Sequence, residues 1–120
     1  MEYVINKKLT EADFEQLKLV QGYDHNYVLD NYTGEMRKIA EAEAAGRKME
    51  VYTDLPGVQF YAGNCIGSNI GKGGFKNMKR KGFCLETQYY PNSANVKEFP
   101  QPIFDSKNPY DTTTVYKFIW

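Results

Sequence analysis

Two short segments alternate polar and apolar side chains, and their polar sets are of a kind that binds hydroxyl groups. If residues 83–90 form a strand, one face carries Phe83, Leu85, Thr87 and Tyr89, and the other carries Cys84, Glu86, Gln88 and Tyr90. In the same way, residues 58–62 place Gln59 and Tyr61 opposite Val58, Phe60 and Ala62. A carboxylate or amide beside a tyrosine suits a sugar, whose hydroxyls need planar polar groups and whose C–H faces pack on rings. A plain solvated sheet face explains the same pattern, so both interpretations stay open.

Glu86 is a candidate for acid/base chemistry. It lies between Leu85 and Thr87 in an aromatic-rich segment, where partial burial would strengthen it as a general base. An exposed strand glutamate is the alternative. His25 is the only histidine and follows Asp24, but adjacent strand residues point to opposite faces. That pair therefore favours a structural or surface histidine over a catalytic dyad.

Residues 63–82 form a glycine-rich basic loop that contains two motif-like patterns. Residues 66–74 resemble a phosphate-binding loop, but the spacing is one residue short and Gly73 stands where Ser or Thr would bind magnesium. The cationic residues of this loop cluster around a single aromatic residue, Phe75, which favours a solvated loop over a nucleic-acid surface. Asn31-Tyr32-Thr33 is a formal glycosylation sequon, and we expect it to be unused.

The composition narrows the class of protein. A chain of 120 residues has room for one domain, and its 15 basic and 15 acidic residues give no electrostatic reason to expect nucleic acid or a membrane as partner. No run of about 18 apolar residues and no signal-peptide pattern occur, so we expect a cytoplasmic protein. Two cysteines, Cys65 and Cys84, with one histidine predict neither a zinc site nor a disulfide framework.

The aromatic and glycine content favours strands over a helical bundle, since aromatics reach 15% and glycine is 10 of 120 residues. Predicted strands cover residues 49–53, 58–62, 83–90 and 112–120, whereas residues 9–19 predict one or two helical turns or a loop. Pro56-Gly57 predicts a type II turn in which glycine supplies the positive φ. Residues 36–46 are ambiguous, because Ala40, Ala42 and Ala44 alternate like a strand while their intrinsic propensity is helical.

Four segments together resemble the C-terminal part of the aldose 1-epimerase (galactose mutarotase) family. They are residues 22–29 with Asp24-His25-Asn26, residues 51–64 with Pro56-Gly57-Val58-Gln59, residues 82–88 with Leu85-Glu86-Thr87, and residues 90–100. Their order and spacing match as well as their residues, from about Leu17 to the C-terminus.

The resemblance implies a mostly β fold, the C-terminal part of a galactose-mutarotase-like antiparallel β-sandwich, with residues 36–46 as a strand. It implies the interconversion of α and β anomers of a hexopyranose such as galactose or glucose, without a cofactor. Glu86 matches the family's catalytic base, and Asp24 and Gln59 match positions that hold sugar hydroxyls. Residues 1–120 then form a single domain.

The resemblance also implies that the acid opposite this base is a histidine in the family's N-terminal half, which these residues do not match. We therefore expect a C-terminal piece with a hexose as its ligand. One alternative is a sugar-binding module or pseudoenzyme without turnover. Another is a subunit completed by a separate N-terminal half or by self-association.

Overall fold

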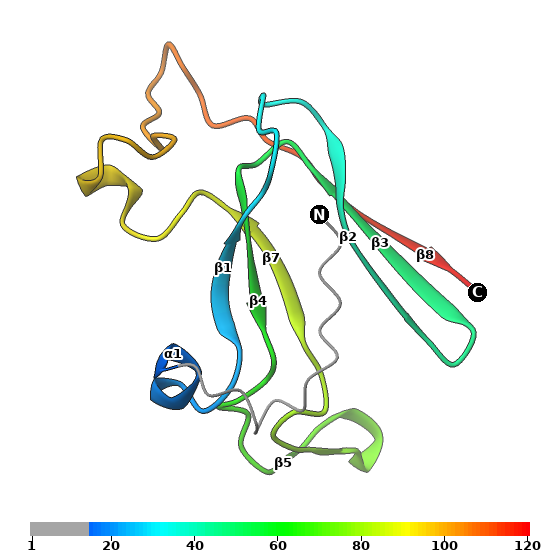
Figure 1. Ribbon diagram of the computed structural model, residues 1–120. Helices are drawn as coiled ribbons and strands as arrows, with labels where there is room; N and C mark the ends of the chain where they lie inside the picture. Colours follow the sequence, from blue (N-terminus) through cyan, green and yellow to red (C-terminus); the bar gives the residue numbers. More distant parts are fainter. Residues whose placement is uncertain (1–14) are drawn as a thin grey trace. The chain divides into compact units, whose positions relative to one another are not determined.

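Strands are the main regular elements of the computed structural model, which describes residues 15–120. The elements are α1 (Glu15–Leu19), β1 (Asp24–Val28), β2 (Arg37–Ala44), β3 (Arg47–Thr53), β4 (Gly57–Tyr61), β5 (Asn69–Ile70), the 3₁₀ turn η1 (Lys72–Gly74), β6 (Lys76–Asn77), β7 (Cys84–Gln88), the 3₁₀ turn η2 (Ser93–Asn95) and β8 (Thr114–Ile119). They form sheets with the orders β1-β4-β7, β2-β3-β8 and β5-β6 (Figure 1). The predicted mostly β class is confirmed. In the described part of the chain, no helix is long and apolar enough to cross a membrane.

The chain divides into two compact units. The first holds residues 1–25 and 59–86, of which 15–25 and 59–86 are described, and the second holds residues 26–58 and 87–120. Each of β1, β4 and β7 passes from one unit into the other along the chain.

The second unit contains the antiparallel sheet β2-β3-β8, built around a central β3. Ala42 pairs with Met49, and Val51 pairs with Tyr116 on the other side. Val51 is fully buried. A two-residue turn joins β2 to β3, and both of its residues, Ala45 (φ 50°) and Gly46 (φ 72°), take the positive φ that type I′ hairpins require. Residues 37–44 thus form the strand that the family resemblance implies, and the helix favoured by propensity is wrong, because cross-strand pairing outweighs intrinsic preference.

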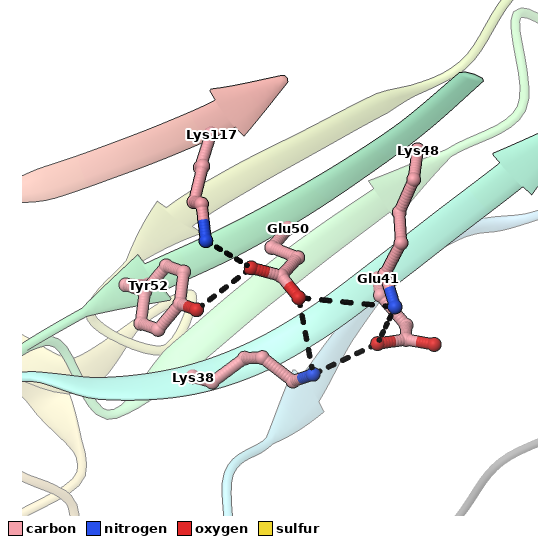
Figure 2. A network of polar contacts seen from close by, with 6 residues as sticks. All are labelled: Lys38, Glu41, Lys48, Glu50, Tyr52 and Lys117. Carbon is pink, nitrogen blue, oxygen red and sulfur yellow. Dashed lines mark hydrogen bonds and ion pairs between the residues drawn. The ribbon is translucent and has the colours of Figure 1, made fainter. Parts of the chain in front are cut away.

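One face of this sheet carries a network of charges (Figure 2). The Glu50 carboxylate lies at its centre, with a side chain only 12% exposed, and accepts a hydrogen bond from Tyr52 at 2.9 Å. Lys117 of β8 lies 3.3 Å from Glu50, and Lys38 and Lys48 each bridge Glu50 to Glu41. These contacts tie all three strands together and lower the pKa of Glu50 from its ordinary value, first through the Tyr52 hydrogen bond and then through Lys117.

The turn before β4 is buried and needs internal partners for its carbonyl groups. The Arg37 guanidinium supplies them, donating to the Thr53 and Leu55 carbonyl oxygens, each at 3.3 Å. Pro56 is fully buried, but Gly57 does not have a positive φ, so the predicted type II turn is wrong. Gly57 is required instead by close packing: an added Cβ would lie 2.7 Å from Asn26 Oδ1 and 3.0 Å from the Tyr90 ring.

Contacts between aromatic side chains stabilise the proline-containing segment after β7, residues 91–109, within the second unit. Phe104 packs edge-on against Tyr89 (5.8 Å) and Tyr110 (4.9 Å), and Tyr90 packs against Phe99 (5.2 Å). Burial, and to a smaller extent a hydrogen bond with Tyr32, raises the pKa of Tyr89 to about 12.

The first unit contains α1, the first residues of β1 and the basic loop of residues 63–82. Of the predicted helical turns at 9–19, residues 15–19 are helical, and residues 9–14 lie outside the described part. Leu17 is buried, and its carbonyl accepts the Gly22 amide at 2.9 Å. Most of the basic loop is exposed, as predicted, although Gly63 and Asn64 at its start are buried. It also contains the small antiparallel hairpin β5-β6, which the glycine-rich sequence did not reveal.

Candidate functional site

The three predicted site residues come from three strands of one sheet. Asp24 begins β1, Gln59 lies in β4 and Glu86 lies in β7, and β4 is the middle strand. All three belong to the first unit. The alternation of side chains along a strand decides on which face each of them lies. The order of the strands places Gln59 between the other two residues.

Asp24 and Gln59 are in direct contact. Gln59 Nε2 donates a hydrogen bond to Asp24 Oδ1 at 2.8 Å, across 35 residues of sequence. The Asp24 side chain is exposed and Gln59 is half-buried, so the pair stands at the solvent-facing side of the strands. A hydrogen bond to an ionised acceptor is stronger than a neutral one, and it holds both groups in one orientation. The second Asp24 oxygen can then accept from a hydroxyl of a bound ligand.

Glu86 is exposed, as the alternative of an exposed strand glutamate predicts, so the structure does not show the partial burial that would strengthen it as a base. Its flanking residues Leu85 and Thr87 point to the opposite face of β7 and do not cover it. On Glu86's own face lies Cys84. Partial desolvation raises the pKa of the Cys84 thiol, and the charge and hydrogen bond of the Glu86 carboxylate raise it further. The thiol therefore stays protonated beside a carboxylate that solvent can reach.

His25 makes local contacts that agree with the structural or surface histidine favoured by the sequence. Its Nδ1 accepts a hydrogen bond from the Asp24 backbone amide at 2.9 Å, and its ring lies edge-on to Tyr23 with centroids 6.0 Å apart. The Asp24 carboxylate bonds to Gln59 rather than to this imidazole. No Asp–His dyad forms at these positions.

An aromatic layer supports β4 within the first unit. Phe60 packs against Tyr23 (5.6 Å) and Phe83 (6.0 Å), which uses the apolar face predicted for residues 58–62. On the other face, the Tyr61 hydroxyl accepts the Cys65 amide at 2.8 Å and so joins β4 to the basic loop. The hydroxyl of Tyr61, whose ring is a candidate for packing on sugar C–H groups, is thus bound to this loop.

Asn64 is a positioning residue that sequence reasoning missed. It is buried, with 4% of its surface exposed, and its Nδ2 donates to the Tyr23 carbonyl at 2.8 Å, next to Asp24. Gly22 makes room for it, since an added Cβ there would lie 2.2 Å from Asn64 Oδ1. The only signal in the sequence is an asparagine directly after Gly63, at the end of a strand.

Within residues 15–120, no three histidine, cysteine or acidic side chains gather in a way that could hold a metal ion. Cys65 and Cys84 are both free and exposed.

Most of this chain is similar to known proteins. Residues 3–117 match the profile of the family described as aldose 1-epimerase. The chain is 44% identical to galactose mutarotase of Bos taurus and 42% identical to that of Homo sapiens, each over 102 residues. It is 35% identical over 112 residues to aldose 1-epimerase of Escherichia coli strain K12. These matches cover 82%, 82% and 90% of this chain but only 30%, 30% and 32% of the relatives' own lengths.

Proposed function

The chain belongs to the aldose 1-epimerase family, and from that premise we propose that it carries the base and part of the sugar site of an enzyme that interconverts the α and β anomers of a hexopyranose. Galactose is the first candidate substrate, because two of the relatives bear the name galactose mutarotase. The observation that best supports this proposal is the hydrogen bond between Asp24 and Gln59, which pairs the two side chains expected to hold sugar hydroxyls. We further propose that residues 1–120 act as one domain.

In the proposed reaction, Glu86 removes the proton from the anomeric hydroxyl. The electrons of that O–H bond form a carbonyl at C1, the bond from C1 to the ring oxygen breaks, and the ring oxygen takes up a proton. Rotation about the C1–C2 bond and the reverse sequence then give the other anomer. Exposure of Glu86 supports this role, because the base must reach a substrate hydroxyl within hydrogen-bond distance.

The proton for the ring oxygen needs a second group. His25 is the only histidine in the 120 residues, and its Nδ1 already accepts the Asp24 amide. The family resemblance assigns the acid to a histidine outside the matched segment. We therefore propose that Glu86, Asp24 and Gln59 supply the base half of the chemistry, and that the acid comes from residues beyond this chain, either in a longer protein or in a separately made partner.

The first experiment follows the optical rotation of freshly dissolved α-D-galactose in the presence of the purified chain. We expect a weak acceleration over the buffer rate that disappears in Glu86→Gln. Glu43→Gln, which changes an exposed glutamate of β2, is the matched control and should retain the acceleration. Equal rates for the wild type and Glu86→Gln, both above buffer, would show that Glu86 is not the base.

A second candidate function is sugar binding without turnover, favoured by the fact that the Asp24–Gln59 contact does not involve Glu86. Calorimetric titration with galactose distinguishes the two. Binding that survives Glu86→Gln in a chain with no rate acceleration would favour this second candidate.

A further inference from the structure

The hairpin formed by β5, η1 and β6 combines exposed apolar side chains with positive charge. Ile70 is 80% exposed and Phe75 is 73% exposed, and both are large apolar residues. Ile66 and Met78, which flank the hairpin, are 37% and 39% exposed. Single exposed apolar residues are ordinary, but four exposed large apolar side chains within one loop are a local accumulation.

The charge of the basic loop, residues 63–82, is of one sign. It contains five cationic residues and no acidic one: Lys72, Lys76, Lys79, Arg80 and Lys81. The other hundred residues therefore hold ten basic and fifteen acidic side chains, so the overall balance conceals a local excess. Two of the five help to fix the loop, because Lys79 donates to Gln21 Oε1 at 2.9 Å and Arg80 donates to the Gln21 carbonyl.

The other three cationic side chains, Lys72, Lys76 and Lys81, are exposed, and none forms an ion pair within residues 15–120. Lys76 pairs with Ile70 across the hairpin, so an ammonium group and an apolar side chain share one face.

The backbone makes the hairpin tip a defined shape. The Gly71 amide donates to the Phe75 carbonyl at 2.7 Å, and Gly73 and Gly74 close the turn with φ of 70° and 78°. An added Cβ at either glycine would meet nothing within 4 Å, so both glycines border open space. In Figure 1 the hairpin extends from the loop that joins β4 to β7.

We propose that this hairpin docks the protein on an anionic lipid surface. The exposed side chains of Phe75 and Ile70 would insert at the boundary between the lipid headgroups and acyl chains, where aromatic rings are favoured. Lys72 and Lys76 belong to the hairpin, and with Lys81 of the same loop they would add electrostatic attraction to the negatively charged headgroups. A protein partner would need a complementary concave surface of its own, whereas a bilayer accepts a protruding tip without one. This proposal is independent of the proposed sugar chemistry.

The test is co-sedimentation of the full 120-residue chain with vesicles of phosphatidylcholine mixed with phosphatidylserine, and with vesicles of phosphatidylcholine alone. Binding should require phosphatidylserine and weaken as salt is raised. Replacement of Lys72 and Lys76 by Gln should weaken it about 25-fold, since each lysine near such a surface contributes about fivefold. Phe75→Ser, introduced alone into the wild-type chain, should also weaken binding, because the lipid contact is apolar as well as electrostatic.

Matched controls come from the second unit. Lys97 and Lys107 are exposed lysines, and Ile103 is 66% exposed, so Lys97→Gln with Lys107→Gln and Ile103→Ser should bind like the wild type. Circular dichroism establishes that each variant is folded. The proposal is wrong if the folded chain does not bind mixed vesicles. It is equally wrong if the control variants lose as much binding as the hairpin variants, or if Phe75→Ser binds unchanged, which would show simple attraction to any polyanion.

Discussion

At the start of β4, Gly57 lies against Asn26 and Tyr90 within the second unit. Asn26 Oδ1 is already occupied, since it accepts a hydrogen bond from Gln88 Nε2 at 3.1 Å. A methyl group at position 57 must displace this side chain or the ring. We predict that Gly57→Ala lowers the free energy of unfolding by about 1–3 kcal/mol, measured by urea denaturation.

Gly67→Ala is the control for that change, because an added Cβ at Gly67 has no neighbour within 4 Å. A similar loss of stability in both variants would mean that crowding is not the reason for Gly57.

The contact between Gln59 and Asp24 gives a second prediction at this scale. Gln59→Leu keeps the side-chain volume but removes the donor to Asp24 Oδ1. We expect galactose to bind about 10- to 100-fold more weakly, because a leucine offers no polar group to a sugar hydroxyl and no longer holds Asp24 in one orientation. Calorimetric titration measures the change, with Gln16→Leu at an exposed position of α1 as the control. Unchanged affinity in Gln59→Leu would remove this residue from the proposed sugar site.

Residue types and the resemblance of motifs identified Asp24, Gln59 and Glu86 as candidates. They did not predict the contacts or the exposure of these side chains. The contact between Asp24 and Gln59 depends on β1 lying beside β4, a tertiary pairing that local sequence does not encode. Exposure of Glu86 was similarly open, because it depends on what covers each face of β7. Asn64 was missed since its role consists of one hydrogen bond to a backbone carbonyl.

Among the elements, the β2-β3-β8 sheet gives a pH-dependent prediction. The pKa of Glu50 is lowered chiefly by the Tyr52 hydrogen bond, and the pKa of Glu41 is lowered by hydrogen bonds from Lys38 and Lys48. A lowered carboxyl pKa means that the folded state favours the ionised form. The network therefore stabilises the fold fully above the ordinary glutamate pKa of 4.5, and the contribution is lost as the pH falls through the lower, folded-state values.

We expect the urea midpoint of the wild type to fall more steeply than that of Glu50→Gln as the pH is lowered from neutral to about 3. High salt should reduce the difference, because most of the lysines involved are solvent-exposed. Glu43→Gln removes a β2 carboxylate that is exposed and outside the network of Figure 2, and should follow the wild-type curve. Parallel pH curves for the wild type and Glu50→Gln would contradict this account.

Elements were predicted well where side-chain alternation was strong and poorly where backbone geometry decided. The strands at 49–53, 58–62, 83–90 and 112–120 appear as β3, β4, β7 and β8, with ends shifted by a few residues. Residues 37–44 needed the family resemblance, because their alanines and glutamates favour helix until β3 pairs with them. The β5-β6 hairpin was missed because each of its strands has two residues, too few to show a period.

For the whole molecule, the activity to expect depends on how much of its relatives' length this chain covers. The match spans 30% of the bovine protein, and the single histidine of this chain is committed to a backbone amide. We predict that the 120-residue chain accelerates mutarotation at least ~10²- to 10⁴-fold less than a full-length relative, the usual contribution of one acid/base group. Polarimetry of both proteins at equal concentration measures the ratio. A rate near that of the full-length relative would contradict the assignment of the acid to residues outside this chain.

Because Tyr89 packs against Phe104, the absorbance of its phenol can report whether the second unit is folded. With its pKa raised to about 12, this phenol stays neutral in the folded protein at alkaline pH values where an unfolded tyrosine, with an ordinary value of 10.0, has lost its proton. Alkali therefore draws the equilibrium toward the unfolded chain. The phenolate absorbance that Tyr89 contributes, isolated by subtracting the spectrum of Tyr89→Phe, should rise together with the loss of folded structure and not before it.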